Sequence, residues 1–157
     1  MTDLWPFIKT RRSMCQRTAR ASTTHSTSRP TAVICSADID KLMALWADDD
    51  EVICVHPGGP RVVGPRAIRV AFEAMFSGGR INAHPERVRR LHTLDAAVHN
   101  LVERIELQTN EGPRTGHVLA TNVYLKTAQG WRLVAHHASP GTAHETPEIV
   151  EAPAVLH

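Results

Sequence analysis

Three long strand patterns near the end of the chain constrain its fold most strongly. They are AAVHNLVERIELQ from residue 96, GHVLATNVYLKT from residue 116 and GWRLVAHHAS from residue 130. Each combines β-branched or aromatic residues with period-two alternation, which is typical of half-buried strands. Because only a short AQG link joins the second pattern to the third, we expect these two strands to form a hairpin.

Two helical patterns precede these strands. In SADIDKLMALW, from Ser36 to Trp46, apolar residues recur at i, i+3, i+4 and i+7, and Ser36 or Asp38 could cap the start. Between the helices, EVICVH reads as a strand and PGGP as a turn. Gly64-Pro65 then opens a second helix, whose apolar side carries Ile68, Phe72, Met75 and Phe76. This order predicts an α+β domain with the helices packed on one face of a bent antiparallel sheet.

The chain divides into three parts. Residues 1–35 form a basic, Ser/Thr-rich segment that we expect to be poorly ordered, residues 36–142 form the domain, and residues 143–157 form a Pro-rich tail. Six of the lysines and arginines fall before residue 31 against one acidic residue, so the net charge of +2 conceals a slightly acidic domain. A solvated tail explains the basic segment better than a nucleic-acid arm, so nucleic acid is not an expected partner.

Several locations and site types find no support in the sequence. No apolar run approaches the roughly 18 to 20 residues that a membrane helix requires, so we expect no membrane partner. The three cysteines, Cys15, Cys35 and Cys54, share no CxxC spacing, which favours a reducing cytoplasm. The stretch HPGGPRVVG has neither spacing of the phosphate-binding glycine motifs, so no cofactor is expected.

The ten histidines invite a metal hypothesis that their spacing does not favour. His136 and His137 are neighbours on a strand, so they point to opposite faces and cannot clamp one ion together. No HxH or HExxH motif is present. We therefore expect no metal site.

The strand beginning at Ala97 places two polar residues on its apolar face. Alternation puts His99 and Glu103 on the same side as Leu101 and Ile105. A carboxylate that faces a core is costly unless it is paired or lines a wet cavity, which makes Glu103 a candidate pocket residue. The alternative is an edge position from which Glu103 reaches solvent.

Two stretches, LWADDDEVICVHPGGPRVVGPRAIRVAFEAMF and ATNVYLKTAQGWRLVAHHAS, resemble a known family. They are similar to the SnoaL-like, ketosteroid-isomerase-like branch of the nuclear-transport-factor-2-like superfamily. The resemblance implies a cone-shaped α+β barrel with a deep pocket between the bent sheet and the helices, and usually a homodimer formed through the sheet. It leaves activity open, because the superfamily contains isomerases, dehydratases, cyclases and noncatalytic association domains.

The resemblance also suggests site residues. His56, which precedes a proline, stands where steroid isomerases have the aspartate that shuttles the proton. Asn122 stands where they have a protonated aspartate that donates to the developing oxyanion. The positions of Asn122 and Glu103 hold pocket arginines in kinase association domains, and strand alternation adds His136 to the interior of the cone.

Alternatives remain for several of these residues. His56 is either a neutral base at the pocket mouth or the strand end that fixes the Pro-Gly-Gly turn. Tyr124 could lie in the pocket or in a dimer interface, and Trp46, a candidate ligand contact together with His99, is more typical of the core. The segment TTHSTSRPTAVICS also lacks the tyrosine that the first helix of the isomerases carries.

The sequence therefore predicts a pocket for a small apolar or weakly acidic molecule. One hypothesis is a proton-transfer isomerase or dehydratase that uses no cofactor, with His56 as base and Asn122 and Glu103 as orienting groups. The alternative is a noncatalytic ligand-binding, dimerisation or association module.

Overall fold

The computed structural model describes residues 38–77, 81–109 and 112–142. The predictions for residues 1–35 and 143–157, and the segment where the first family helix is expected, lie outside these ranges. Within them the elements in chain order are α1 (Ile39–Met43), β1 (Ile53–Val55), β2 (Arg61–Val63), α2 (Pro65–Ser77), β3 (Ile81–His92), β4 (Ala96–Thr109), β5 (Gly112–Thr127) and β6 (Gly130–Pro140).

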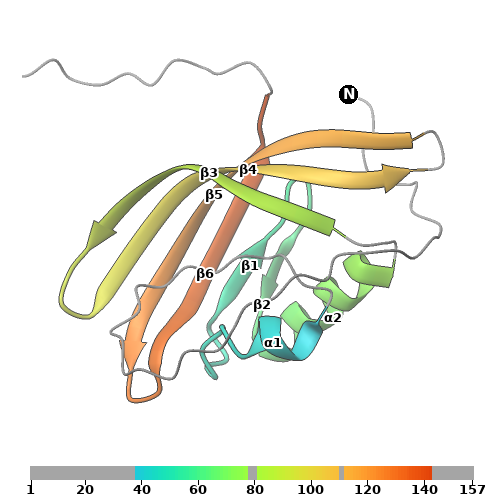
Figure 1. The fold of residues 1–157 in the computed structure, drawn as a ribbon. Coiled ribbons are helices and arrows are strands. Elements are labelled where there is room, and N and C mark those ends of the chain that lie inside the picture. The colour runs from blue at the N-terminus through green and yellow to red at the C-terminus, as the bar shows by residue number, and fades with distance from the viewer. Residues whose placement is uncertain (1–37, 78–80, 110–111, 143–157) are drawn as a thin grey trace, which may run out of the picture.

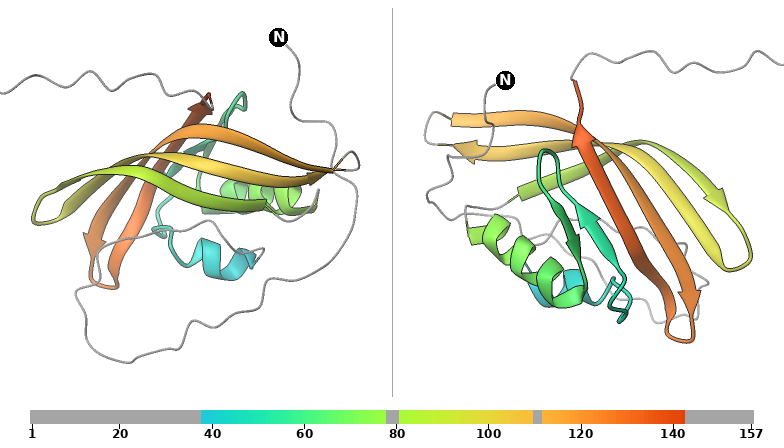
Figure 2. Two further views of the ribbon diagram at one scale, coloured as in Figure 1. Left: turned by 45° about the horizontal axis from the view of Figure 1, so that its top comes forward. Right: turned by 180° about the vertical axis from the view of Figure 1, so that it is seen from behind.

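The six strands form one bent sheet, and both helices lie on the same side of it (Figures 1 and 2). The strand order is β2-β1-β6-β5-β4-β3, so β2 and β3 are the edges and the sheet is not closed. All pairs are antiparallel except β1 and β6, which run parallel. The α+β class, the bent sheet and the β5–β6 hairpin are confirmed, whereas the parallel pair was not predicted.

Helix α1 is shorter than its sequence pattern indicates. Asp38 caps its start, as predicted, by accepting a hydrogen bond from the backbone N–H of Lys41. The prediction that Trp46 belongs to this helix is wrong, because Trp46 lies beyond it and forms a parallel bridge with Leu133 of β6. The backbone N–H of Ala47 donates to the carbonyl of Leu133, so the chain leaves the helix to pair with the sheet.

Strands β2 and β3 were not predicted. The sequence of β3, INAHPERVRRLH, is strongly charged and contains a proline, and this obscures its alternation. Its pairing with β4 is interrupted by a bulge between Glu86 and Arg89, and Arg87 within it has a φ of 48°. Such a bulge bends an edge strand, which curves this end of the sheet over the helices.

Helix α2 closes the core against the inner face of the sheet, which we define as the face that the helices cover. Its first residue is Pro65, as predicted, and its side chains Ile68 and Phe72 are fully buried. They pack in one cluster with Leu42, Trp46, Ala47, Val52, Cys54, Ala97, Tyr124 and Leu133. The helices and this part of the inner face therefore share one apolar cluster.

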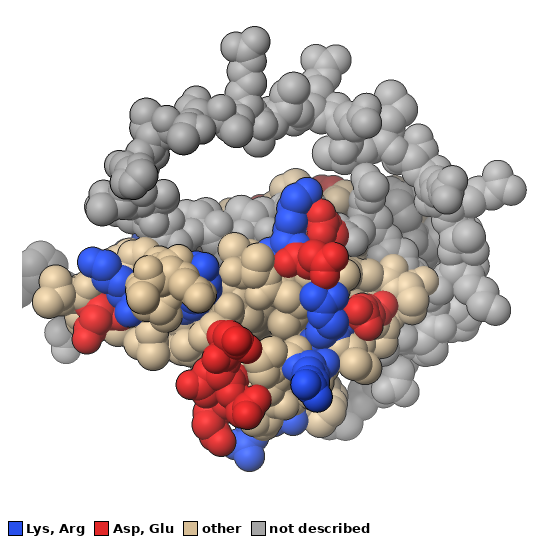
Figure 3. All heavy atoms as spheres, turned by 90° about the horizontal axis from the view of Figure 1, so that it is seen from below, with Lys and Arg blue, Asp and Glu red and all other residues tan. Residues whose placement is uncertain are grey.

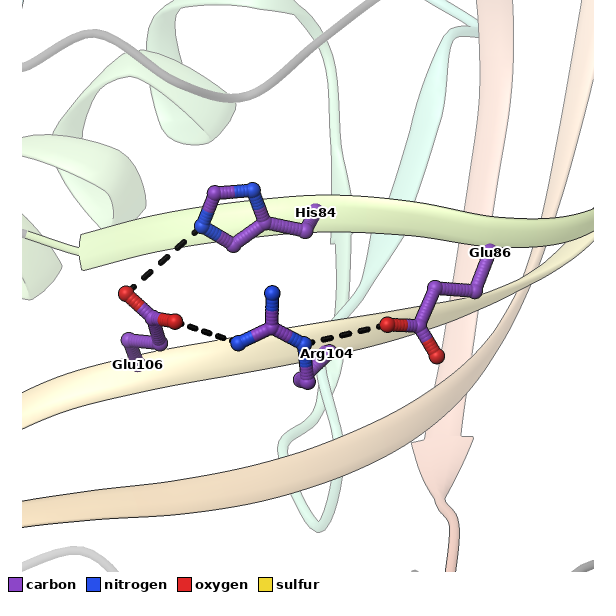
Figure 4. A network of polar contacts seen from close by, with 4 residues as sticks. All are labelled: His84, Glu86, Arg104 and Glu106. Atoms are coloured by element: carbon purple, nitrogen blue, oxygen red, sulfur yellow. Dashed lines mark hydrogen bonds and ion pairs between the residues drawn. The ribbon is translucent and has the colours of Figure 1, made fainter.

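The outer face of the sheet is polar along β3 and β4. Arg104 hydrogen-bonds Glu86 and Glu106, and the second oxygen of Glu106 lies 3.6 Å from Nε2 of His84 (Figure 4). All four side chains are partly exposed, so this network is worth little stability. Arg104 follows Glu103 directly, and strand alternation sends these two side chains to opposite faces.

Surface charge on the described residues is mixed. The face in Figure 3 shows lysine and arginine side chains in small groups beside aspartate and glutamate, with uncharged surface between them. A nucleic-acid backbone is followed by a continuous basic stripe, which this view of the described residues does not show. No helix among the described residues is long and apolar enough to cross a membrane.

Candidate functional site

A row of polar side chains crosses the apolar inner face of the sheet. Strand pairing aligns the members of this polar row laterally, and they are Arg90 of β3, His99 of β4, Asn122 of β5, His136 of β6 and Cys54 of β1. The three central members are each less than 5% exposed. Because burying polar groups costs free energy unless they are hydrogen-bonded, a buried polar row is a strong candidate for a site.

The centre of the row is a hydrogen bond between Asn122 and His136. Nδ1 of His136 lies 2.6 Å from Oδ1 of Asn122. An amide oxygen can only accept, so the imidazole carries its proton on Nδ1 and leaves Nε2 unprotonated. Burial, together with the nearby His56 and His137, lowers the pKa of His136 to about 4. His136 is therefore a neutral residue that positions the Asn122 amide.

The Asn122 amide nitrogen remains available to a ligand. No hydrogen bond joins it to another of the described residues, and Asn122 lines a small pocket on the inner face. With its oxygen fixed by His136, the amide presents N–H donors. A neutral donor of this kind can stabilise negative charge that develops on a carbonyl oxygen.

His56 lies beside this pair, immediately after β1. Its ring centroid is 6.0 Å from that of His136 and 4.9 Å from that of Phe72, which it meets edge-on. Its Nε2 is 3.6 Å from Sγ of Cys54. Burial lowers the pKa of His56 and raises that of the Cys54 thiol to about 12, so both groups are neutral at pH 7.

Both readings of His56 have a structural counterpart. The carbonyl of His56 accepts a hydrogen bond from the backbone N–H of Gly59, which closes the Pro-Gly-Gly turn. Gly58 in this turn has a φ of 72°, a conformation that favours glycine. The backbone of His56 therefore fixes the turn while its ring faces the core, and the one role does not exclude the other.

His99 and Tyr124 continue the site toward the edge of the sheet. Their ring centroids are 5.0 Å apart, and Nε2 of His99 lies 3.4 Å from Nε2 of His92. Burial lowers the pKa of His99, and the positive charges of Arg90 and His92 lower it further. The pocket at this end is lined by Pro85, Val88, Arg90, His99, Leu101, Asn122 and Tyr124.

Glu103 lies on the inner face but apart from the row. It is 6% exposed, and burial raises its pKa. Four residues of strand separate it from His99, which corresponds to about 13 Å. Between them lie Leu101 and its lateral neighbours Ala120 and Ala138, which form a small apolar cluster. No hydrogen bond or ion pair joins the Glu103 carboxyl to the other described residues. The alternative prediction, an edge position from which Glu103 reaches solvent, is wrong because the side chain is buried.

Trp46 belongs to the core, with one unusual feature. Its side chain is 4% exposed and packs in the cluster below α2. Its indole Nε1 is buried and finds no hydrogen-bond partner among the described residues. Such a donor is uncommon in a native core and is available to a ligand that could reach it.

The structure thus brings three of the predicted site residues together, namely His56, Asn122 and His136. His99 and Tyr124 adjoin this group, whereas Glu103 and Trp46 lie outside it. Cys54 and Arg90 were missed, although Cys54 stands two residues before His56 and could have been placed on the same face by alternation. Among the described residues, no group of three or more His, Cys, Asp or Glu side chains is arranged to hold a metal ion.

Comparison with protein families identifies the domain. Residues 29–143 match the model of the SnoaL-like domain. The chain belongs to the SnoaL-like family. A search of curated proteins gave no match.

Solved structures agree with this SnoaL-like assignment. A protein from Thiobacillus denitrificans, provisionally assigned as a calcium/calmodulin-dependent protein kinase type II association domain, is 36% identical over 67% of this chain and 83% of its own, with a TM-score of 0.60. A provisionally assigned dehydratase of the nuclear-transport-factor-2-like family from Streptomyces avermitilis is 29% identical over 68% and 84%, with a TM-score of 0.62. The kinase hub of S. rosetta, at 24% identity over 69% and 86% with a TM-score of 0.54, shares the fold.

Proposed function

We propose that this SnoaL-like domain binds a small carbonyl compound on its inner face and catalyses proton transfer beside the carbonyl, as an isomerase or dehydratase does. The observation that carries the proposal is the His136–Asn122 hydrogen bond next to the His56 ring. It supplies an oriented neutral donor and a neutral imidazole within one apolar site. These are the two groups that proton abstraction next to a carbonyl requires.

His56 is the base in this proposal. His136 is a poor candidate because its pKa is about 4 and its Nδ1–H is committed to Asn122. His56 is less deeply buried and makes no ion pair with another described residue, so its imidazole can accept a proton from carbon. Phe72 packs edge-on against the ring and restricts its orientation.

The remaining predicted residues have supporting roles. Asn122 donates to the carbonyl oxygen, and His136 holds the Asn122 amide in place. Tyr124 and His99 line the pocket, and Trp46 supports it from the core. Glu103, whose pKa is raised by burial, is placed to meet the far end of a longer ligand.

Hydrogen exchange at carbon tests the proposal directly. The purified protein is incubated in D2O with a panel of small ketones, and deuterium incorporation beside the carbonyl is followed by NMR. His56→Gln should reduce exchange by about a hundredfold or more. His137→Gln is the matched control, because His137 is exposed on the opposite face of β6. Equal exchange by wild type and His56→Gln would remove His56 as the base.

A second candidate is a noncatalytic association module. It is favoured by the 36% identity to the Thiobacillus denitrificans protein, which is named for an association domain. In this case the chain forms a homodimer through the outer face of the sheet, where Leu119 is 46% exposed. Native mass spectrometry of the wild type and of Leu119→Asp tests this candidate. A wild-type dimer that the substitution dissociates, in a protein that catalyses no deuterium exchange, would favour association alone.

A further inference from the structure

Arg90 is a cation at the mouth of the inner-face pocket. It lies on edge strand β3 and is paired in register with His99 of β4. Its side chain is exposed, lines the pocket and forms no ion pair with any described residue. An arginine beside an apolar pocket, without a carboxylate partner of its own, is well suited to bind an anion.

The groups around Arg90 are also hydrogen-bond donors or neutral. His99 and His92 contact one another next to it, and Asn122 follows His99 along the polar row. The described side chains that line this pocket include no aspartate or glutamate. Glu86 pairs with Arg104 on the outer face. Glu103, on the inner face in register with Pro85, does not line the pocket, and burial raises its pKa, which favours its neutral form. The electrostatic field at the pocket mouth therefore favours negative charge.

The walls of the pocket are apolar. Pro85, Val88 and Leu101 contribute apolar side chains to the lining that they share with Arg90. A ligand that fits this arrangement has an anionic end, an apolar body and an oxygen acceptor that reaches Asn122. Arg90 and Asn122 lie two strands apart, so their backbones are about 10 Å from one another. The long arginine side chain brings the guanidinium within this distance of the Asn122 amide.

We propose that the ligand of this site is a small oxo acid, whose carboxylate is bound by Arg90 and His99 and whose carbonyl oxygen accepts from Asn122. This inference rests on the proposed function for the location of the carbonyl and adds the chemical class of the substrate. The carboxylate is a monoanion at neutral pH, and the planar guanidinium can bind it with two hydrogen bonds.

Matched pairs of acids and amides test this assignment. The probes are 4-oxopentanoate and 6-oxoheptanoate with their neutral amides, and the dissociation constants are measured by NMR titration of the full-length chain. The acid of at least one pair should bind about tenfold more tightly than its amide, a difference typical of one charge-assisted contact. Raising the salt concentration should reduce this preference, because Arg90 is exposed.

Two variants separate a pocket effect from a general charge effect. Arg90→Gln should abolish the preference for the acid, because it weakens binding of the acid much more than binding of the amide. Arg66→Gln removes the same charge from the exposed surface of α2 and should preserve the preference. Circular dichroism confirms that both variants fold.

The outcomes distinguish this inference from the proposed function. Equal binding of acid and amide by the wild type, a preference that Arg90→Gln retains, or no saturable binding of either probe would overturn the oxo-acid assignment. A preference for the acid that depends on Arg90 but occurs without deuterium exchange would support the assignment and remove the catalytic proposal. Deuterium exchange of neutral ketones without any preference for acids would support the catalytic proposal and overturn the oxo-acid assignment.

Discussion

The side chains of His136 and Asn122, on neighbouring strands, are joined by a buried hydrogen bond of 2.6 Å between Nδ1 and Oδ1. This contact fixes the tautomer of one residue and the amide orientation of the other. Both side chains lie on an otherwise apolar face, where an unpaired polar atom is expensive. The same hydrogen bond therefore stabilises the domain and orients the Asn122 amide in its candidate site.

Replacing Asn122 tests the energetic role of this bond. Asn122→Leu leaves the Nδ1–H group of His136 buried and unpaired, and should lower the free energy of unfolding by about 1–3 kcal/mol. Asn122→Asp keeps an acceptor and adds a negative charge, which should raise the pKa of His136. Urea denaturation and NMR titration of the imidazole measure the two effects. An Asn122→Leu variant as stable as the wild type would show that the bond is energetically unimportant.

Stability should depend on pH through the buried histidines. The pKa of His136 falls from 6.5 in the unfolded chain to about 4 in the folded one, and burial lowers that of His56. The unfolded state therefore binds protons first, so stability is complete above pH 6.5 and is lost as the pH falls toward 4. The loss from His136 alone is on the order of 3 kcal/mol.

Urea midpoints measured from pH 7.5 to 4.5 would check this slope. His136→Gln keeps an amide donor for Asn122 but cannot titrate, so its slope should be shallower. An unchanged slope in this variant would assign the acid sensitivity to other groups.

Glu103 should make stability depend on pH in the opposite direction to the histidines. Burial raises its pKa, so its folded form prefers the proton. Its contribution to stability is complete below the unfolded pKa and is lost as the pH rises through the folded pKa. Glu103→Gln removes this loss and should be more stable than the wild type at pH 7, with the difference vanishing below about pH 4.

Glu106→Gln is the matched control for this experiment. Glu106 lies on the same strand but faces outward, where hydrogen bonding to Arg104 lowers its pKa. Thermal denaturation of both variants at pH 7 should show a higher melting temperature than the wild type for Glu103→Gln alone. A gain of equal size in both would indicate a change in net charge rather than relief of burial.

Trp46 offers a test of its unpaired indole. Trp46→Ala should lose about 3–5 kcal/mol of stability, because it empties the core below α2. Trp46→Phe removes the orphan N–H while keeping an aromatic ring, and should change the free energy of unfolding by less than about 1.5 kcal/mol. Chemical denaturation measures both variants. A large loss in Trp46→Phe would mean that the buried Nε1 has a stabilising partner in solution.

Much of the fold could be predicted because it depends on local periodicity. Alternation along β4 predicted an apolar face that contains His99 and Glu103, and both side chains are buried. The same reasoning separated His136, which is buried, from His137, which is exposed. The Gly64-Pro65 pair marked the start of α2, whose first residue is Pro65. In each case the backbone geometry of a single element sets the pattern, so nearby residues suffice.

The polar row was decided by tertiary structure. Its members come from five strands, and their alignment depends on four registers, on the bulge in β3 and on the parallel pairing of β1 with β6. Charged residues and a proline hid β3, and with it Arg90, because an edge strand tolerates both. Trp46 likewise fits a helical pattern in the sequence, but in the structure it lies beyond α1 and pairs with β6. The sequence determined which side of each strand faces the core. Which residues become lateral neighbours was decided by hydrogen bonds between distant segments, which no local pattern encodes.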